Sequence, residues 1–215
     1  MVNCYPVNLL IEGKPCLVIG GGAVAERKVR SLLLAGAVVT VISPRLTDGL
    51  AKLAADRQII HVDRPYQTGD TTGHLLVICA ADRSEINRLV SEEAQAQRIL
   101  VNVVDAPEKG DFLVPAQVAR GDLLLTVSTG GHSPALSRRL REKLAAEYGP
   151  EYGQYLELIA KARQKVKNRI HSADERVCFW RETLDSEILA LLRQGRMQEA
   201  EAKINDAIDC IGIKP

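Results

Sequence analysis

The stretch CLVIGGGAVAERKVRSLLLA, residues 16–35, predicts the fold of the first half of the chain. Residues 16–19 are a short apolar run of the kind that forms a buried parallel strand. The glycine-rich turn that follows, residues 20–25, matches the G-x-G-x-x-A pattern of dinucleotide-binding folds. Apolar residues then recur at helical spacing, namely Ala25, Val29, Leu32 and Leu33. The order of strand, turn and helix favours a nucleotide site over a glycine-rich turn that binds nothing.

The small residues of this pattern have distinct roles. Gly20 allows the tight turn, and Gly22 lets the backbone come close to a pyrophosphate. Ala25 is small enough for the following helix to lie close to the sheet. The free N–H groups and the positive dipole end of that helix then point toward the phosphates.

Strand and helix patterns alternate through the first half of the chain, as in a doubly wound parallel sheet. Further strands are predicted at residues 37–42, 59–62, 75–80 and 99–104, with helices around 46–53 and 86–94. The spacing then changes, because residues 112–115 and 123–128 are both strand-like with only a short segment between them. These two stretches predict a small extra sheet, which a second subunit could complete. The rest of the chain predicts helices, with apolar positions that include Leu184 and a break near Gly195.

The composition is that of an ordinary globular protein and argues against several function classes. A net charge of +1 argues against a general binder of nucleic acids or membrane surfaces. No apolar run approaches the roughly 20 residues needed to span a bilayer. The start of the chain lacks the features of a signal peptide, so we expect a cytoplasmic protein. The cysteines form no C-x-x-C pair and the histidines show no ligand spacing, so we expect no preformed metal site, although a metal could still enter as a substrate.

The turn after the second predicted strand bears on the choice of cofactor. Dinucleotide folds usually have an acidic residue there, which binds the ribose hydroxyls, but this chain has Ser43, Pro44 and Arg45. The missing acid weakens the preference for NAD over NADP, and Arg45 could accept a 2′-phosphate. Equally, the segment could be a polar turn that contacts the ribose through backbone groups alone.

Asp105 follows the strand predicted at residues 99–104. It therefore lies at the carboxyl edge of the sheet, where ligands bind in such folds. A carboxylate at that place could accept a proton while hydride leaves the substrate for the cofactor. The alternative is an aspartate that only forms the turn before Ala106 and Pro107.

A third candidate element is TGGHSPALSRRLREK, residues 129–143. Ser133 is typical of a helix N-cap and Pro134 of a first helical residue. Backbone donors, a positive helix end and the arginines that follow suit a substrate with several carboxylates. A solvated charged face is the alternative. His132 could carry a proton, although loop histidines more often do not.

Taken together, these segments resemble the siroheme synthase family, in particular its precorrin-2 dehydrogenase/sirohydrochlorin ferrochelatase members. The matching pieces are LVIGGGAVAERKVRSLLLAGAVVTVISP (17–44), NVVDAPEKGDFLVPAQVARGDLLLTVSTGGHSPALSRRLREKL (102–144) and RVCFWRETL (176–184). The resemblance implies an α/β fold with an N-terminal NAD-binding Rossmann domain, residues 1–112. It also implies a central dimerisation region with swapped elements, residues 113–148, and a helical C-terminal domain, residues 149–215.

The resemblance further implies an activity and its site. The reaction would be oxidation of precorrin-2 by NAD⁺ to sirohydrochlorin, followed in many members by insertion of Fe²⁺, a substrate rather than a bound cofactor. Asp105 would be the base for both steps, since chelation also removes two pyrrole protons. Cofactor contacts would fall on Gly20, Gly22, Ala23, Val24, Ser43, Pro44 and Arg45. The tetrapyrrole carboxylates would meet Thr129, Gly130, Gly131, His132, Ser133 and Arg138.

The implied partners are the tetrapyrrole and a second copy of the chain, without nucleic acid or membrane. The chain stops where larger fused members continue into a uroporphyrinogen methyltransferase domain, so we expect that activity to be absent. Three alternatives remain open at this point. The chain could be a dehydrogenase that leaves chelation to another enzyme, a different dehydrogenase with a small anionic substrate, or a non-catalytic NAD-sensing module.

Overall fold

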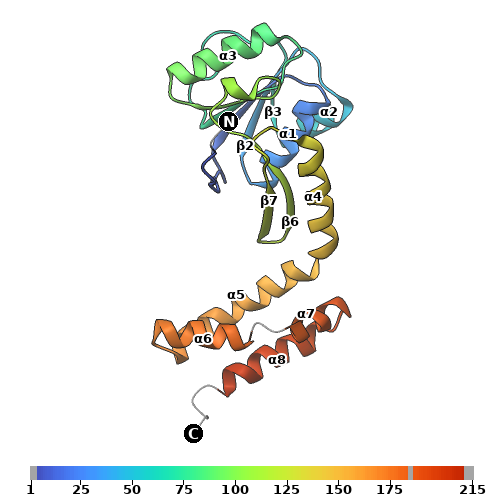
Figure 1. Cartoon of the computed structure of the whole chain (residues 1–215). Coiled ribbons are helices and arrows are strands. Elements are labelled where there is room, and N and C mark those ends of the chain that lie inside the picture. Colours follow the sequence, from blue (N-terminus) through green and yellow to red (C-terminus); the bar gives the residue numbers. More distant parts are fainter. Residues whose placement is uncertain (1–3, 184–185, 211–215) are drawn as a thin grey trace. The chain divides into compact units, whose positions relative to one another are not determined.

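The structure of the chain is a computed structural model that describes residues 4–183 and 186–210 (Figure 1). It consists of two compact units. The first unit takes in the chain to Val114 together with Gly130–His132, and the second takes in Pro115–Thr129 and the chain from Ser133 onward. Leu184, an apolar position of the predicted helices, lies outside the described residues.

The first unit is built on a parallel sheet whose five strands lie in the order β3-β2-β1-β4-β5. This order and the parallel pairing confirm the predicted Rossmann-type fold. Each predicted strand of the sheet is present, and each of its ends lies within one residue of the prediction. The elements are β1 Pro15–Ile19, α1 Ala23–Leu34, β2 Val38–Ile42, α2 Asp48–Ala55, β3 Ile60–Val62, β4 Leu76–Cys79, α3 Ser84–Ala96, β5 Leu100–Val103 and the short 3₁₀ helix η1 Pro107–Lys109.

The two faces of the sheet pack against different helices. On one face, Val18 and Val41 lie in a cluster with Val29 of α1 and Leu50 of α2. On the other face, Leu17 and Val103 belong to a cluster with Val90 of α3. Successive strand residues alternate between the two clusters because side chains in a strand point to opposite faces. Burial on both faces explains why these strands are continuous apolar runs.

The strand expected at residues 112–115 is absent, and that prediction is wrong. The next strand of the chain is β6, which spans Ala116–Arg120. Phe112 is instead bound to the edge of the parallel sheet, because its carbonyl oxygen accepts a hydrogen bond of 2.8 Å from the Asn102 side chain. Pro115 has no backbone N–H and so cannot donate to a strand ladder. The proline is visible in the sequence and argues against a strand, whereas the hydrogen bond from Asn102 is a tertiary contact that the apolar run could not reveal.

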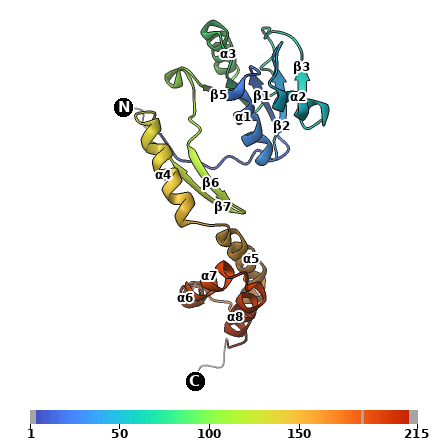
Figure 2. The same ribbon diagram turned by 90° about the vertical axis from the view of Figure 1, so that its right-hand side faces the viewer.

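The second unit begins with a β-hairpin and a helix. β6 pairs antiparallel with β7, Leu123–Val127, and α4 spans Pro134–Glu147. Figures 1 and 2 both show α4 alongside the hairpin. Within the described residues of these three elements, Val118 is the one buried side chain. An isolated two-stranded sheet is marginally stable in water, so this part of the chain lacks a core of its own.

The rest of the second unit is helical and has a separate core. Its helices are α5 Glu151–Arg169, α6 Ala173–Thr183, α7 Ser186–Arg193 and α8 Met197–Asp209. Val166 of α5, Ile188 of α7 and Ile204 of α8 are among the buried residues that form this core. The predicted break near Gly195 is the turn between α7 and α8, where Gly195 adopts a φ of +73°. In the described residues, no helix is both long and apolar enough to cross a membrane.

Candidate nucleotide site

The glycine turn after β1 meets the backbone that follows β4. Gly20 has a φ of +120°, a conformation that residues with side chains rarely adopt, and a Cβ there would overlap the carbonyl oxygen of Ala80. A Cβ on Gly21 would likewise overlap the carbonyl oxygen of Arg45. These two glycines are therefore required by the protein's own packing.

Gly22 differs from its neighbours in this turn. Its φ of −83° suits any residue, and a Cβ there would meet no atom within 4 Å. Neither backbone strain nor packing within the described structure therefore demands a glycine at this position. An open space above the backbone fits a ligand group that approaches residue 22 closely, as the pyrophosphate of a dinucleotide does.

The helix that follows presents unused backbone donors. α1 has Gly22 as its N-cap, and no side-chain hydrogen bond caps this end in the described structure. The loop is held in place by two backbone hydrogen bonds, from Gly20 N–H to Ile42 (3.0 Å) and from Thr47 N–H to Gly21 (2.9 Å). The positive end of α1 is thus fixed beside the carboxyl ends of β1 and β2, an arrangement suited to anions.

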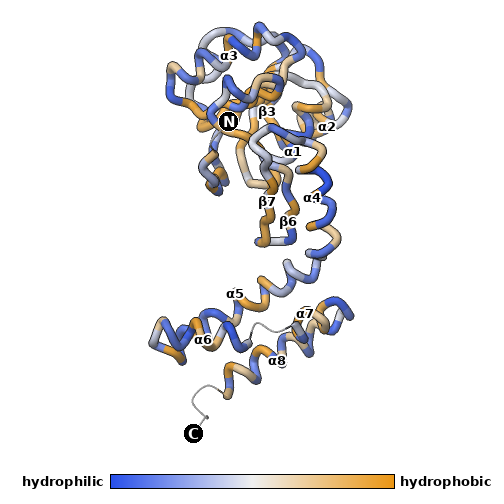
Figure 3. Tube along the Cα trace, viewed as in Figure 1, coloured by the Kyte–Doolittle hydropathy of each residue, from blue (hydrophilic) through white to orange (hydrophobic). Residues whose placement is uncertain are grey.

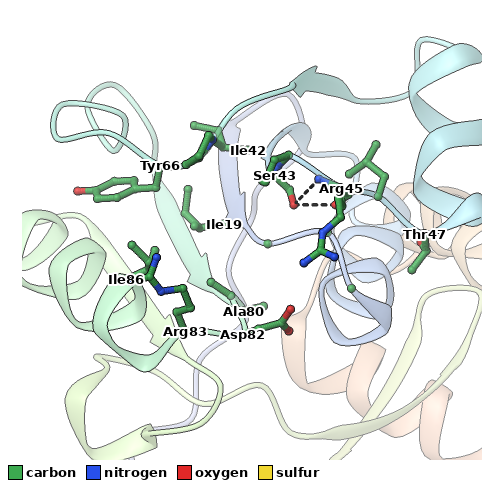
Figure 4. A pocket seen from close by; sticks show the side chains of 17 residues that line it. Ile19, Ile42, Ser43, Arg45, Thr47, Tyr66, Ala80, Asp82, Arg83 and Ile86 are labelled. Atoms are coloured by element: carbon green, nitrogen blue, oxygen red, sulfur yellow. Dashed lines mark hydrogen bonds between the residues drawn. The ribbon is translucent and has the colours of Figure 1, made fainter.

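A pocket of about 540 Å³ lies at this edge of the sheet (Figure 4). It spans the ends of β1, β2 and β4, which is the place where the strand order reverses direction along the chain. One part of its wall is apolar and includes Ile19, Ile42 and Ile86. Further lining residues are Gly20, Gly21, Gly22, Ser43, Pro44, Arg45, Leu46, Thr47, Pro65, Tyr66, Ala80, Ala81, Asp82 and Arg83.

The predicted cofactor residues divide between the pocket wall and the helix start. Gly20, Gly22 and the segment from Ser43 to Arg45 line the pocket. Ala23 and Val24 are exposed at the start of α1 but are not among the lining residues. Because they lie in the first turn of the helix, their backbone N–H groups still face the N-terminal end.

The segment after β2 forms a compact turn without an acidic residue. The Ser43 hydroxyl donates to the carbonyl oxygen of Arg45 (2.7 Å), and the Arg45 N–H donates back to that hydroxyl (3.4 Å). These bonds occupy the Ser43 hydroxyl, whereas the Arg45 side chain is exposed and extends into the pocket (Figure 4). A guanidinium in that place is the group that commonly accommodates a 2′-phosphate.

A partly buried polar cluster, which sequence reasoning missed, holds the loop that carries Tyr66. Glu93 of α3 accepts hydrogen bonds from the hydroxyls of Tyr66 and Thr71 and from the backbone N–H groups of Gly69 and Thr71. Burial would raise the pKa of Glu93, but these donors outweigh it and lower the pKa below its usual value. Glu93 lies 22 to 27 positions away in the sequence from the residues that it binds, so no local pattern could have revealed the cluster.

Asp105 lies just beyond β5, exposed and outside the residues that line the pocket. Its Oδ1 accepts a hydrogen bond of 3.1 Å from the side-chain amide of Asn87 in α3. Asn87 is only 2% exposed and also bonds both backbone groups of Ala81, which lines the pocket. Sequence reasoning did not single out Asn87, because an asparagine within a predicted helix has no distinctive pattern.

The turn at residues 129–133 has the conformation that its sequence predicts. Gly130 and Gly131 adopt φ values of +60° and +83°, and Ser133 caps α4 by accepting a hydrogen bond from Leu136 N–H. The Thr129 hydroxyl bonds the backbone of Ser133 and the side chain of Ser137. His132 is exposed.

The charged face of α4 is largely solvated. Arg138 is 79% exposed and pairs with Glu142 at 3.0 Å, one helical turn away. Its role in substrate binding, like that of residues 129–133, stays a prediction.

The fold and the pocket define a dinucleotide-binding α/β protein. Residues 7–116, half of the chain, match a family model described as "Putative NAD(P)-binding". Residues 120–147 match "Sirohaem biosynthesis protein central", and residues 151–208 match "Sirohaem synthase dimerisation region". The chain belongs to the siroheme synthase family.

Among similar curated proteins is the siroheme synthase of Methylobacillus flagellatus, 42% identical over 199 residues, which cover 93% of this chain and 43% of that protein. The siroheme synthase of Thioalkalivibrio sulfidiphilus is 39% identical over 208 residues, covering 97% and 42%. The chain therefore spans less than half the length of these relatives. A solved structure named "SirC, precorrin-2 dehydrogenase" matches with a TM-score of 0.76 and 26% identity, covering 94% of this chain and all of that one.

The description "dimerisation region" falls on α5 to α8, which our prediction assigned to the helical C-terminal domain. The hairpin and α4, predicted as the dimerisation region, largely match the central region instead. The boundaries at residues 112 and 148 stay a prediction.

Proposed function

We propose that this chain is a precorrin-2 dehydrogenase, which oxidises precorrin-2 to sirohydrochlorin with NAD⁺ as hydride acceptor. The observation that supports this most strongly is the likeness to a solved precorrin-2 dehydrogenase along 94% of this chain. The pocket at the glycine turn supports the nucleotide part of the proposal independently, because Gly22 lines it and leaves open space beside the backbone for a pyrophosphate.

Asp105 is our candidate base for the oxidation. The reaction removes two electrons and two hydrogens from the tetrapyrrole, one hydrogen as hydride to NAD⁺ and the other as a proton. One carboxylate oxygen of Asp105 bonds Asn87, which leaves Oδ2 to accept that proton. Asp105 is exposed, so a substrate can reach it without a change in the first unit.

Insertion of Fe²⁺ into sirohydrochlorin is a second, separate proposal. In the described residues, no group of three or more His, Cys, Asp or Glu side chains is arranged to hold a metal ion. We therefore treat Fe²⁺ as a substrate that the tetrapyrrole nitrogens bind while their two protons leave. The same Asp105 carboxylate would accept one of these protons.

We also propose that the chain forms a homodimer. One support is the family description of a dimerisation region, which falls on α5 to α8. A second is α4, which carries exposed apolar side chains and along which hydrophobic and hydrophilic segments alternate (Figure 3). The hairpin and α4 bury little against each other, so a second copy could supply the missing core. A cytoplasmic location and the lack of nucleic-acid partners stay predictions.

The decisive experiment is anaerobic incubation of the purified chain with precorrin-2 and NAD⁺, with NADH and sirohydrochlorin followed by absorbance. We expect both products to appear together, and Asp105→Asn to slow their formation by about 100-fold or more while NAD⁺ still binds. Glu108→Gln is the matched control, because it neutralises an exposed carboxylate only three residues away. Fe²⁺ added afterwards tests chelation, by comparison of the rate with a protein-free control.

The alternatives predict different outcomes. A non-catalytic NAD-sensing module would bind NAD⁺ and produce no NADH, and Asp105→Asn would leave its nucleotide binding unchanged. A dehydrogenase for another small anion would bind NAD⁺ but leave precorrin-2 unchanged. A chain that produces sirohydrochlorin without accelerating Fe²⁺ insertion would be a dehydrogenase only.

A further inference from the structure

We propose that Asn87 is the positioning residue for Asp105, holding its carboxylate in a fixed orientation relative to the wall of the nucleotide pocket. The inference rests on the proposed function, in which Asp105 is the base. It assigns a role to a side chain of α3 that is buried and does not line the pocket.

The side-chain amide of Asn87 makes three hydrogen bonds. Its Oδ1 accepts from Ala81 N–H at 3.0 Å, and its Nδ2 donates to the Ala81 carbonyl oxygen at 3.0 Å and to Asp105 Oδ1 at 3.1 Å. Both N–H groups and the oxygen of the amide are thereby used. A buried amide saturated in this way has one rigid orientation.

The chemistry of the partners determines which end of the amide faces Asp105. A backbone N–H can only donate, so the atom that faces Ala81 N must be the oxygen of Asn87. A carbonyl oxygen and a carboxylate can only accept, so the atom that faces Ala81 O and Asp105 must be the nitrogen. The flipped amide would lose all three hydrogen bonds, so Asn87 can only present an N–H group to Asp105.

These bonds connect two strand ends at one edge of the sheet. Ala81 follows β4 and lines the nucleotide pocket, whereas Asp105 follows β5. β4 and β5 are parallel neighbours, and the buried thiol of Cys79 at the end of β4 lies close enough to Asp105 to be affected by its charge. Asn87 thus ties the candidate base to the same backbone segment that the dinucleotide would contact.

Asparagine suits this position better than a charged donor. A neutral N–H orients one carboxylate oxygen without forming an ion pair, so the other oxygen stays free to accept a proton. In the described residues, Asp105 takes part in no salt bridge. Exact placement matters, because a displacement of about 1 Å can cost roughly 100-fold in rate.

The test uses Asn87→Leu, which keeps the branching at Cγ and removes the amide, and Asn87→Asp, which keeps the shape and replaces the N–H donor by an acceptor. We expect kcat for NADH formation from precorrin-2 to fall about 10- to 100-fold in both. The KM for NAD⁺ should change by no more than about twofold, because Asn87 does not line the pocket. A KM that rises while kcat is kept would overturn the proposal.

Ser91→Ala is the matched control. Ser91 is buried on the same helix and donates to the carbonyl oxygen of Lys109, in the segment just after Asp105. This variant removes a similar bond between α3 and the chain beyond β5 without touching Asp105. We expect a lower melting temperature with kcat kept. If Ser91→Ala lowers kcat as much as Asn87→Leu does, general loosening explains both and the proposal is wrong.

A double-mutant cycle separates this inference from the proposed function. In an Asp105→Asn background, Asn87→Leu should cause no further loss of kcat, because the positioned group is already gone. Equal losses in both backgrounds would show that Asn87 acts independently of Asp105. If Asp105→Asn is fully active, the proposed base itself is wrong. If Asp105→Asn is strongly slowed while both Asn87 variants keep full kcat, only the role of Asn87 is refuted.

Discussion

Gly20 packs so tightly against Ala80 that no Cβ fits between residue 20 and the Ala80 carbonyl oxygen. This approach joins the turn after β1 to the end of β4, at the place where the strand order reverses. Two residues further on, the backbone at Gly22 meets nothing within 4 Å. The same glycine-rich turn therefore combines one position required by packing with another that leaves space for a ligand.

Alanine substitutions should distinguish these two roles. We expect Gly20→Ala to lower the free energy of unfolding by about 1–3 kcal/mol or more, through backbone strain and overlap with Ala80. Gly22→Ala should keep the stability and lose most of the affinity for NAD⁺. Chemical unfolding and calorimetric titration with NAD⁺ measure the two effects. A Gly22→Ala chain that binds NAD⁺ normally would contradict the assignment of this space to the pyrophosphate.

Arg45 should influence the choice between NAD⁺ and NADP⁺. Its guanidinium extends into the pocket, and in the turn from Ser43 to Arg45 no carboxylate would repel a 2′-phosphate. We expect Arg45→Ala to weaken NADP⁺ binding roughly 10-fold, as loss of a charged hydrogen bond does, and to leave NAD⁺ binding nearly unchanged. Arg27→Ala, at an exposed arginine of α1 outside the pocket, is the control. If the wild-type and Arg45→Ala chains each bind NAD⁺ and NADP⁺ equally well, the turn contacts the ribose through its backbone groups alone.

Glu93 should stabilise the loop that carries Tyr66, and its contribution should depend on pH. Glu93→Gln removes a charged acceptor shared by Tyr66, Thr71 and Gly69, so we expect a loss of about 1–3 kcal/mol near neutral pH. The pKa of Glu93 is lowered in the folded chain. Its contribution is therefore complete above the usual value of 4.5 and is lost as the pH falls through the folded-state pKa.

Urea unfolding at about pH 7 and about pH 3 measures this dependence. The wild-type and Glu93→Gln chains should differ at neutral pH and converge in acid. Glu92→Gln is the control, because Glu92 is exposed and, within the described part of the chain, pairs with Arg88 on the surface of the same helix. A difference that stays constant across this pH range would indicate that the ionised carboxylate is not responsible.

The proposed dimer should depend on the apolar stripe of α4. Leu136 and Leu140, one turn apart, are 47% and 38% exposed in the single chain. We expect Leu136→Asp to shift the sedimenting species from twice the 23.5 kDa of one chain toward the single-chain mass. Ala146→Asp adds the same charge at an exposed position off this stripe and should leave the assembly intact. A wild-type chain that sediments only as a monomer would refute the dimer directly.

Several features of the fold follow from local sequence patterns. The apolar run at residues 16–19, the three glycines and the helical spacing of Val29 predict β1, the turn and α1 correctly, because each depends on neighbours within a few residues. The break at Gly195 is equally local, since a positive φ favours glycine. The strand prediction at residues 112–115 is wrong, because the Asn102 side chain, ten residues away, binds the backbone of Phe112.

The sequence by itself determined the order of strands and helices and the position of the nucleotide-binding turn. Hydrophobic periodicity and glycine placement specify such features through residues only a few positions apart. Only the tertiary structure decided which side chains meet at the edge of the sheet. Asn87 and Asp105 are 18 residues apart, and Tyr66 and Glu93 are 27 apart. Such pairs form because parallel strands and the helix between them bring segments that are distant in the sequence into contact. No local sequence pattern indicates which of these residues meet.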